Sequence, residues 1–170
     1  MLGGQLASDF ARQLAQAGIH VLVGARDPGR GSAAVAELSA TGLPSQFVRL
    51  DLADHGSITA AAEAIAAEHG RLDILVNNAG ILDADDGPPS SGLPEAARRI
   101  MDTNFVGTLA VTQAMLPLLR QSPAGRIVNL SSSLGSLTLN GDPSSTYYAA
   151  RLIGYNASKA ALNMLTVTLA

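Results

Sequence analysis

The 170-residue sequence contains no cysteine and no tryptophan, and aromatic residues make up only 4% of it. The absence of cysteine excludes disulfide bonds, a catalytic thiol and cysteine-bound metal, and it leaves the redox compartment open. The three histidines, His20, His55 and His69, are far apart in the sequence, and capping or surface roles suit them better than metal ligation. We therefore expect no metal site.

The sequence also lacks a membrane-length apolar run and a cluster of basic residues. Its start has neither the basic residues nor the apolar core of a signal peptide. The net charge is −3 and the 11 basic residues are scattered, which gives no electrostatic reason to expect nucleic acid. These absences favour a cytoplasmic protein that acts on a small molecule. A hydrophobic fraction of 47% and a charged fraction of 15% fit one globular domain over residues 1–170.

Short apolar runs alternate with helix-forming segments along the chain. The expected strands cover residues 19–26, 46–52, 72–76 and 126–130. The expected helices cover residues 7–17, 32–39, 57–69, 93–119 and 155–169. Pro117 is expected to bend or end the fourth of these helices near its last turn. Glycines follow three of these helices, at Gly18, Gly42 and Gly70. This order predicts an α/β fold, a Rossmann-like doubly wound parallel sheet.

The segment Tyr155–Lys159 opens the last expected helix. Tyr155 and Lys159 are four residues apart, so on a helix both side chains project from one face. An ammonium beside a phenol favours the phenolate, which makes the tyrosine a more useful general acid near neutral pH. The spacing alone is also typical of a snorkelling surface pair, so the upstream motifs must distinguish the two interpretations.

Three upstream motifs precede this pair. They are Asn77-Asn78-Ala79-Gly80 after an apolar strand, Asn104 within residues 101–107, and Asn129-Leu130-Ser131-Ser132 at the end of another strand. In this order, followed by Tyr-x-x-x-Lys, they resemble the short-chain dehydrogenase/reductase family over almost the whole chain. The resemblance implies an NAD(P)-dependent oxidoreductase that interconverts a carbonyl and an alcohol by hydride transfer.

The resemblance also implies roles for the catalytic residues. Tyr155 is the expected acid/base, and Lys159 would contact the nicotinamide ribose and stabilise the tyrosinate. Ser132 would hold the substrate oxygen, and Asn104 would position a water in the proton relay. Ser132 is preferred to its two neighbouring serines because it occupies the second serine of the family's Asn-x-Ser-Ser pattern. Ordinary turn hydrogen bonds suit those neighbours.

The cofactor contacts implied by the resemblance are strand-end residues. They are Asn77, which would also fix the central strand, Ala79, Gly80, Asp51 and Leu52, together with Tyr155 and Lys159. Arg26 ends the first expected strand, where dinucleotide folds select between cofactors, and an arginine there suits the 2′-phosphate of NADP. We therefore favour NADP over NAD. The alternative for Arg26 is a solvated charge at a strand end.

The resemblance is incomplete at both ends. Family members begin with an apolar strand and a Thr-Gly-x-x-x-Gly-x-Gly loop, whereas here Met1, Gln5 and Ala7 stand at the glycine positions and no strand precedes them. The missing strand would lie between those that contain Val21 and Leu75, so two strands lose ladder hydrogen bonds. The family's last strands and substrate-binding helices are also missing. A partial reading of a longer enzyme is favoured over a shortened product.

Two connections are candidates for the rim of a site. Asp83–Gly92 is acidic and rich in proline and glycine, and a mobile surface loop is favoured over a ligand-binding segment. Leu134–Gly154 is longer than usual in the family and is a candidate rim of the substrate pocket. Tyr147 and Tyr148 within it have no lysine four residues on, so we interpret them as loop packing.

Other functions remain open at this stage. A non-catalytic binding protein on the same scaffold is the main alternative, because the glycine loop is broken. A Ser-Lys hydrolase using Ser158 and Lys159 is a distant third, because adjacent helix residues point in different directions. Family members commonly pair through helices equivalent to residues 95–119 and 155–169, which implies a homo-oligomer, although packing within one chain explains many of the same apolar residues. The identity of the small carbonyl or alcohol substrate is not encoded in these motifs.

Overall fold

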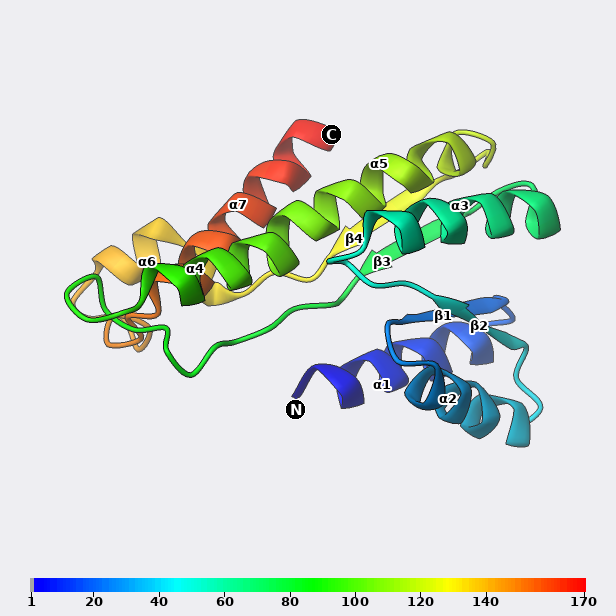
Figure 1. The fold of residues 1–170 in the computed structure, drawn as a ribbon, viewed down its shortest axis with the longest axis horizontal. Helices are drawn as coiled ribbons and strands as arrows, with labels where there is room; N and C mark the ends of the chain where they lie inside the picture. The colour runs from blue at the N-terminus through cyan, green and yellow to red at the C-terminus, as the bar shows by residue number, and fades with distance from the viewer. Residues whose placement is uncertain (1) are drawn as a thin grey trace. The chain divides into compact units, whose positions relative to one another are not determined.

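The computed structural model describes residues 2–170. These residues form two compact units, one ending at Gly70 and the other spanning Arg71–Ala170 (Figure 1). Within the described residues, no helix is both long enough and apolar enough to cross a membrane. The same residues contain no group of three or more His, Asp or Glu side chains that could hold a metal ion. The single domain expected over residues 1–170 stays a prediction.

The first unit is built from two parallel strands and three helices. In chain order these are α1 (Leu2–Gln16), β1 (Val21–Ala25), α2 (Pro28–Ala40), β2 (Ser45–Arg49) and α3 (His55–His69). The strands pair in register, with Val21 opposite Ser45 and Ala25 opposite Arg49. The three glycines expected after helices are confirmed in the left-handed region, with φ values of +82°, +75° and +69° at Gly18, Gly42 and Gly70.

The helix α1 occupies the positions that align with the family's glycine loop, which the sequence lacks. Gln5 and Ala7, two of the three positions aligned with the loop glycines, lie inside α1. Met1, the third position, lies outside the described residues. The helix was predicted to begin at Ala7, but it begins at Leu2. Residues 2–7 therefore form helix where other family members have a phosphate-binding loop, which agrees with the absence of the loop glycines from the sequence.

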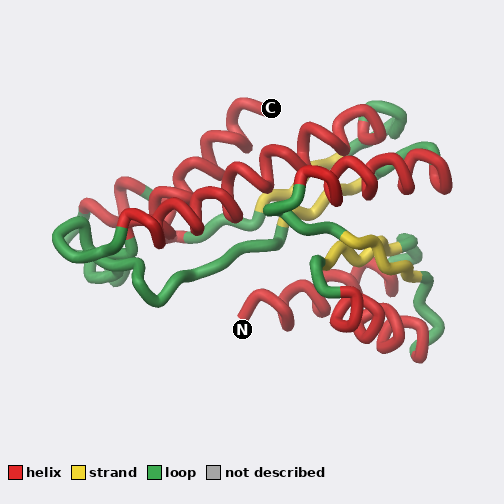
Figure 2. Tube along the Cα trace, in the orientation of Figure 1, coloured by secondary structure: helices red, strands yellow, loops and turns green. Residues whose placement is uncertain are grey.

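The second unit is larger and also contains one parallel strand pair. Its regular elements are β3 (Ile74–Asn77), α4 (Pro94–Met101), a π-helical segment (Asp102–Gly107), α5 (Thr108–Leu119), β4 (Arg126–Asn129), a 3₁₀ turn (Ser133–Gly135), α6 (Leu137–Gly141) and α7 (Ile153–Leu169). β3 and β4 pair in register from Ile74 opposite Arg126 to Asn77 opposite Asn129. The described strands thus form two parallel pairs, β1–β2 and β3–β4 (strands yellow in Figure 2).

The core of the second unit lies between its helices and the β3–β4 pair. Its buried apolar side chains come from α4, α5 and α7, and they are Ala96, Ile100, Val111, Met115, Leu118, Leu119, Leu162 and Leu165. Gly154 allows α4 and α7 to pack closely, since a Cβ there would lie 2.7 Å from the Ala97 Cα. This packing holds the start of α7 in place, which matters because α7 carries Tyr155 and Lys159.

One expected helix differs from its prediction. The single α-helix expected over residues 93–119 is instead α4, the π-helical segment and α5 in succession, and Pro117 lies within α5. Periodicity alone does not reveal a π turn, because it adds one residue without interrupting the helix. Asn104 lies in that wider turn, and its carbonyl accepts a hydrogen bond from Thr108 Oγ1 at 3.0 Å.

Candidate active site

Tyr155 and Lys159 lie one turn apart near the start of α7, as their spacing predicted. Lys159 Nζ lies 5.7 Å from the centroid of the Tyr155 ring. The lysine is buried, with 5% of its surface exposed, and burial lowers its pKa below the usual value. Its Nζ donates to the Leu130 carbonyl at 2.8 Å, which leaves two N–H donors for other partners.

Asn104 is fully buried and joins two parts of the candidate site. Its Oδ1 accepts from Ile81 N at 2.7 Å, and its Nδ2 donates to the Ile81 carbonyl at 3.0 Å and to Ser158 Oγ at 3.1 Å. Ser158 Oγ in turn donates to the Tyr155 carbonyl at 2.8 Å. Asn104 therefore ties the segment after β3 to the helix turn that carries Tyr155. One acceptor position on its Oδ1 remains.

Ser158 was considered as a nucleophile, and the structure gives it a different role. Its side chain has 0% exposure and is hydrogen-bonded on both sides, to Asn104 and to the Tyr155 carbonyl. A nucleophile must reach its substrate, and this hydroxyl has no path to one. The geometry therefore speaks against a Ser-Lys hydrolase.

Asn77 anchors the centre of the second unit. Its Nδ2 donates to Asn129 Oδ1 at 2.8 Å across the strand pair and to Thr112 Oγ1 at 3.1 Å on α5. Asn129 Nδ2 continues the chain to Thr166 Oγ1 on α7 at 2.9 Å. This series of side chains connects both strands with both helices.

Ala79 and Gly80 follow β3 and are exposed. A Cβ at Gly80 would lie 3.4 Å from Asn104 Oδ1 and 3.6 Å from Lys159 Nζ. A larger side chain at this position would fill the space beside the lysine. The structure thus brings Gly80, Asn104, Tyr155 and Lys159 together at the carboxyl end of β3.

The three serines after β4 differ in their hydrogen bonds. Ser131 Oγ donates to Asn163 Oδ1 at 2.5 Å, so its proton is already used within the protein. Ser132 Oγ accepts from Leu134 N at 3.2 Å and caps the 3₁₀ turn, which leaves its own proton for another acceptor. The turn packs on α7, because a Cβ on Gly135 would lie 2.8 Å from the Lys159 carbonyl carbon. The role of Ser132 at the substrate oxygen stays a prediction.

The sequence analysis missed Asp86, whose carboxylate caps α7. Its Oδ1 accepts from Gly154 N and its Oδ2 from Tyr155 N, both at 2.9 Å, and Ile153 N donates to the Gly87 carbonyl at 3.0 Å. The segment Asp83–Gly92 therefore holds the N-terminus of α7. No local sequence pattern indicates this cap, because 68 residues separate Asp86 from Gly154. Only the acidic composition of the segment could have drawn attention to it.

The remaining predicted residues, Arg26, Asp51 and Leu52, belong to the first unit. Arg26 directly follows β1 and is exposed, and no ion pair involves it in the part of the chain that the structure describes. Asp51 follows β2, and its Oδ1 accepts from Ala53 N at 3.1 Å. Its backbone exchanges hydrogen bonds with Ser57 Oγ at 2.9 and 3.1 Å, which fixes the turn containing Leu52.

The chain as a whole is similar in sequence to known proteins. The sequence profile of the short chain dehydrogenase family matches residues 3–170. The chain is 40% identical over 162 residues to short-chain dehydrogenase anuI of Penicillium roqueforti (strain FM164), covering 92% of this chain and 64% of that protein. It is 42% identical over 139 residues to carbonyl reductase [NADPH] 1 of Sus scrofa, covering 82% of this chain and 46% of that protein.

Solved structures agree with the sequence matches. A metagenomic short-chain oxidoreductase in complex with NADP superimposes with a TM-score of 0.80 at 30% identity, covering 96% of this chain and 69% of that one. The chain spans 46% and 64% of the lengths of the two curated relatives. The fold is accordingly the Rossmann-like α/β fold that the alternation of strands and helices along the chain predicted. On the match over residues 3–170, the chain belongs to the short chain dehydrogenase family.

Proposed function

We propose that this chain acts as an NAD(P)-dependent oxidoreductase that interconverts a carbonyl and an alcohol, with Tyr155 as the acid/base. The observation that carries the proposal is the pairing of Tyr155 with a buried lysine on one face of α7, 5.7 Å from ring centroid to Nζ. Membership of the short chain dehydrogenase family supports it. A relative named as an NADPH carbonyl reductase supports the same chemistry.

In this proposal the phenol of Tyr155 gives its proton to the carbonyl oxygen during reduction and takes it back during oxidation. A bound nicotinamide supplies or accepts the hydride. The two free N–H donors of Lys159 stabilise the phenolate and hold a ribose hydroxyl. The free proton of Ser132 orients the substrate oxygen. The remaining acceptor position of Asn104 suits a water in the proton relay.

The residues beside Lys159 fit a nicotinamide cofactor. Ala79 and Gly80 are small and exposed, and the space that a Cβ at Gly80 would fill borders the ammonium of Lys159. We assign Asn77 to hold this strand end in place. Asp51 and Leu52, after β2, are proposed for the adenine. The exposed Arg26 offers an unpaired guanidinium for a 2′-phosphate, so we propose NADP rather than NAD.

A Tyr155→Phe variant tests the proposed acid/base. Loss of the phenol should lower turnover of NADPH with a carbonyl panel by about 10²–10⁴-fold, because that is the usual contribution of a general acid. NADPH binding, followed by its fluorescence, should weaken much less than turnover, because the other proposed cofactor contacts remain. Tyr147→Phe is the matched control, since Tyr147 is exposed and lies in the long connection. Equal turnover by the two variants would rule Tyr155 out as the acid.

A second candidate function rests on helix α1. Because α1 covers the positions that align with the family's glycine loop, and that loop is broken in this sequence, a non-catalytic binding protein on the same scaffold is the alternative. A folded chain that binds neither NADPH nor NADH would favour it. Turnover that depends on Tyr155 would eliminate it.

We also propose a homo-oligomer through residues 95–119 and 155–169. Four large apolar side chains on these helices are exposed in the single chain, namely Val106 at 42%, Met164 at 62%, Val167 at 70% and Leu169 at 38%. Exposed apolar groups at helical spacing are typical of a helix that packs against another copy. A cytoplasmic location stays a prediction.

A further inference from the structure

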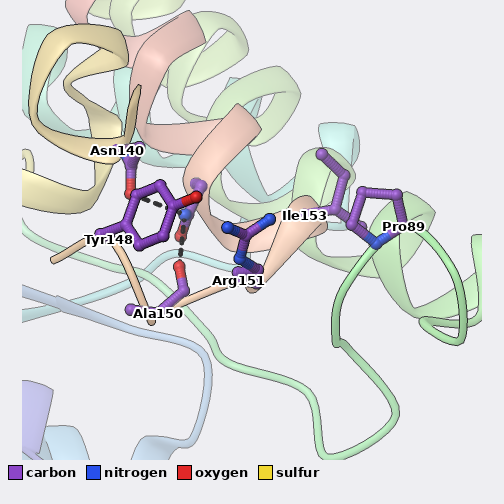
Figure 3. A pocket seen from close by; sticks show the side chains of 7 residues that line it. Pro89, Asn140, Tyr148, Ala150, Arg151 and Ile153 are labelled. Carbon is purple, nitrogen blue, oxygen red and sulfur yellow. Dashed lines mark hydrogen bonds between the residues drawn. The ribbon is translucent and has the colours of Figure 1, made fainter. Parts of the chain in front are cut away.

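A cavity of about 180 Å³ opens beside the start of α7 in the second unit. Its walls include Pro89, Asn140, Tyr148, Arg151, Ile153 and Asn156 (Figure 3). The long connection after β4, expected as a candidate rim of the substrate pocket, supplies Asn140, Tyr148 and Arg151. Ile153 and Asn156 flank Tyr155 in the sequence of α7. The cavity therefore adjoins the helix turn of the proposed acid/base.

Arg151 brings an uncompensated positive charge to this cavity. Its guanidinium lies 4.7 Å from the centroid of the Tyr148 ring, and no carboxylate of the described residues forms an ion pair with it. Two acidic residues are close in sequence to the residues that line the cavity, but both carboxylates form other hydrogen bonds. Asp86 caps α7, and Asp142 accepts from Ser144 N at 2.8 Å and from Ser144 Oγ at 2.7 Å.

Asn156 brings a hydrogen-bond acceptor that lacks a donor. Its Nδ2 donates to the Ala150 carbonyl at 2.8 Å and to Asn140 Oδ1 at 3.2 Å. Its Oδ1 is buried and has no hydrogen-bond partner among the described residues. Turning the amide over would face its oxygen toward the Ala150 carbonyl, so the orientation is fixed. Because this oxygen is buried, it is not exposed to a ligand in the cavity, and the polar contact that the cavity offers is the guanidinium of Arg151.

The size of the cavity limits what it can hold. A cavity of about 150 Å³ holds a benzene ring, whereas pockets for whole ligands are usually about 300–1,000 Å³. This cavity therefore suits one end of a larger molecule. Pro89 and Ile153 give it apolar walls, while the guanidinium of Arg151 supplies a polar contact.

We propose that this cavity takes the carboxylate-bearing end of the substrate, which makes the substrate class an oxo acid or the corresponding hydroxy acid. The proposal rests on the oxidoreductase function proposed above. Arg151 would pair with the carboxylate through its planar fork of N–H donors. Binding this end here leaves the carbonyl to be placed at Tyr155.

The kinetic test compares para-formylbenzoate with its neutral methyl ester as substrates of the full chain with NADPH. In Arg151→Gln the KM for para-formylbenzoate should rise about tenfold, while kcat and the KM for the ester change by less than about twofold. Arg120→Gln is the matched control, since Arg120 is exposed in the same unit and outside the cavity walls. Equal changes for both aldehydes, or none, would overturn the proposal.

A binding test separates this proposal from the proposed function. Saturation-transfer NMR with benzoate should show binding to wild type and to Arg120→Gln, and loss of binding in Arg151→Gln. If this pattern appears but neither aldehyde is reduced, the carboxylate site stands and the oxidoreductase proposal fails. If the wild type binds no benzoate, the carboxylate site is overturned whatever the turnover.

Discussion

Lys159 has more than one demand on its ammonium. It is buried, its Nζ donates to the Leu130 carbonyl, and it lies beside the Tyr155 ring. Burial without a carboxylate partner lowers its pKa, so the fold holds this proton less tightly than the unfolded chain does. A lysine in this state releases or passes on a proton more readily than a solvated one.

The buried ammonium predicts a stability change with pH. Because the pKa of Lys159 is lowered from 10.5 in the fold, the unfolded chain binds more protons between the folded pKa and 10.5, and the free energy of unfolding rises with pH there. Below that window the full penalty of burying the charge is present. Lys159→Met removes the titration, so wild type should gain stability relative to this variant as pH rises from neutral toward 10.5. Urea unfolding at a series of pH values measures the difference, and a constant difference would contradict the burial argument.

Gly135 predicts a second change at the scale of one residue. An added Cβ would lie 2.8 Å from the Lys159 carbonyl carbon and 2.9 Å from its Cβ, and this helix backbone cannot move aside. Gly135→Ala should therefore lower the free energy of unfolding by about 1–3 kcal/mol. Gly141→Ala is the matched control, because a Cβ there meets open space. Its effect should stay below about 1 kcal/mol, and equal effects in urea unfolding would show that the predicted clash is relieved.

The candidate site could be predicted from the sequence only where its residues are close in the chain or match a known motif. The spacing of Tyr155 and Lys159 placed both on one helix face, and the structure bears this out. The partners of Asn104 could not be predicted in this way, because Ile81 and Ser158 reach it from segments 23 and 54 residues away. Such contacts are set by packing and leave no local pattern.

At the scale of elements, the N-terminus of α7 depends on a carboxylate from a distant segment. Asp86 accepts hydrogen bonds from two consecutive backbone N–H groups of α7, which otherwise have no intrahelical partner. Its negative charge also faces the positive end of the helix dipole. Arg99 on α4 holds the same segment through Asp83, with Nε 2.8 Å from Oδ2, and this pair keeps the pKa of Asp83 below its usual value. The acidic segment thus fastens α4 to α7.

An Asp86→Asn variant tests this cap. An amide can accept with only one of its two atoms and carries no charge, so the change should cost about 1–2 kcal/mol of stability. The same change should lower turnover, because it would displace Tyr155. The contacts proposed between NADPH and residues of the first unit should not change. Asp85→Asn is the control, since the Asp85 carboxylate is 58% exposed and 3.6 Å from Arg99. Thermal unfolding that moves equally in both variants would contradict the cap.

For the whole molecule, the alternation of strands and helices was predictable and the pairing of the strands was not. Each expected strand appears within about three residues of its predicted limits, because β-branched runs and glycine stops are local signals. Val21 and Leu75 were expected to flank a missing strand, and their strands do lie in separate pairs, but that expectation came from the family resemblance and not from periodicity. The ladder of a sheet depends on residues far apart in the chain, which periodicity does not reveal.

The choice between NADP and NAD is proposed to depend on Arg26. In Arg26→Asp the affinity for NADPH should fall at least about tenfold, because a carboxylate would replace the guanidinium proposed for the 2′-phosphate. NADH affinity should stay or improve, since a carboxylate can pair with the ribose hydroxyl. Fluorescence titration with each nucleotide measures both. Arg30→Asp, on the exposed start of α2, controls for the change in net charge, and an equal loss there would remove Arg26 from the proposed site.

The π-helical segment Asp102–Gly107 sets which faces of α4 and α5 point the same way. Deleting one residue from it would restore a regular α-helical ladder and would rotate whatever follows by about 100° relative to whatever precedes. Either Asn104 would keep its bonds to Ile81 and Ser158, or Val111 and Met115 would keep their places in the core, but not both. Single-residue deletions in this segment should therefore abolish function. Deletions in the long connection after the 3₁₀ turn should be tolerated more readily.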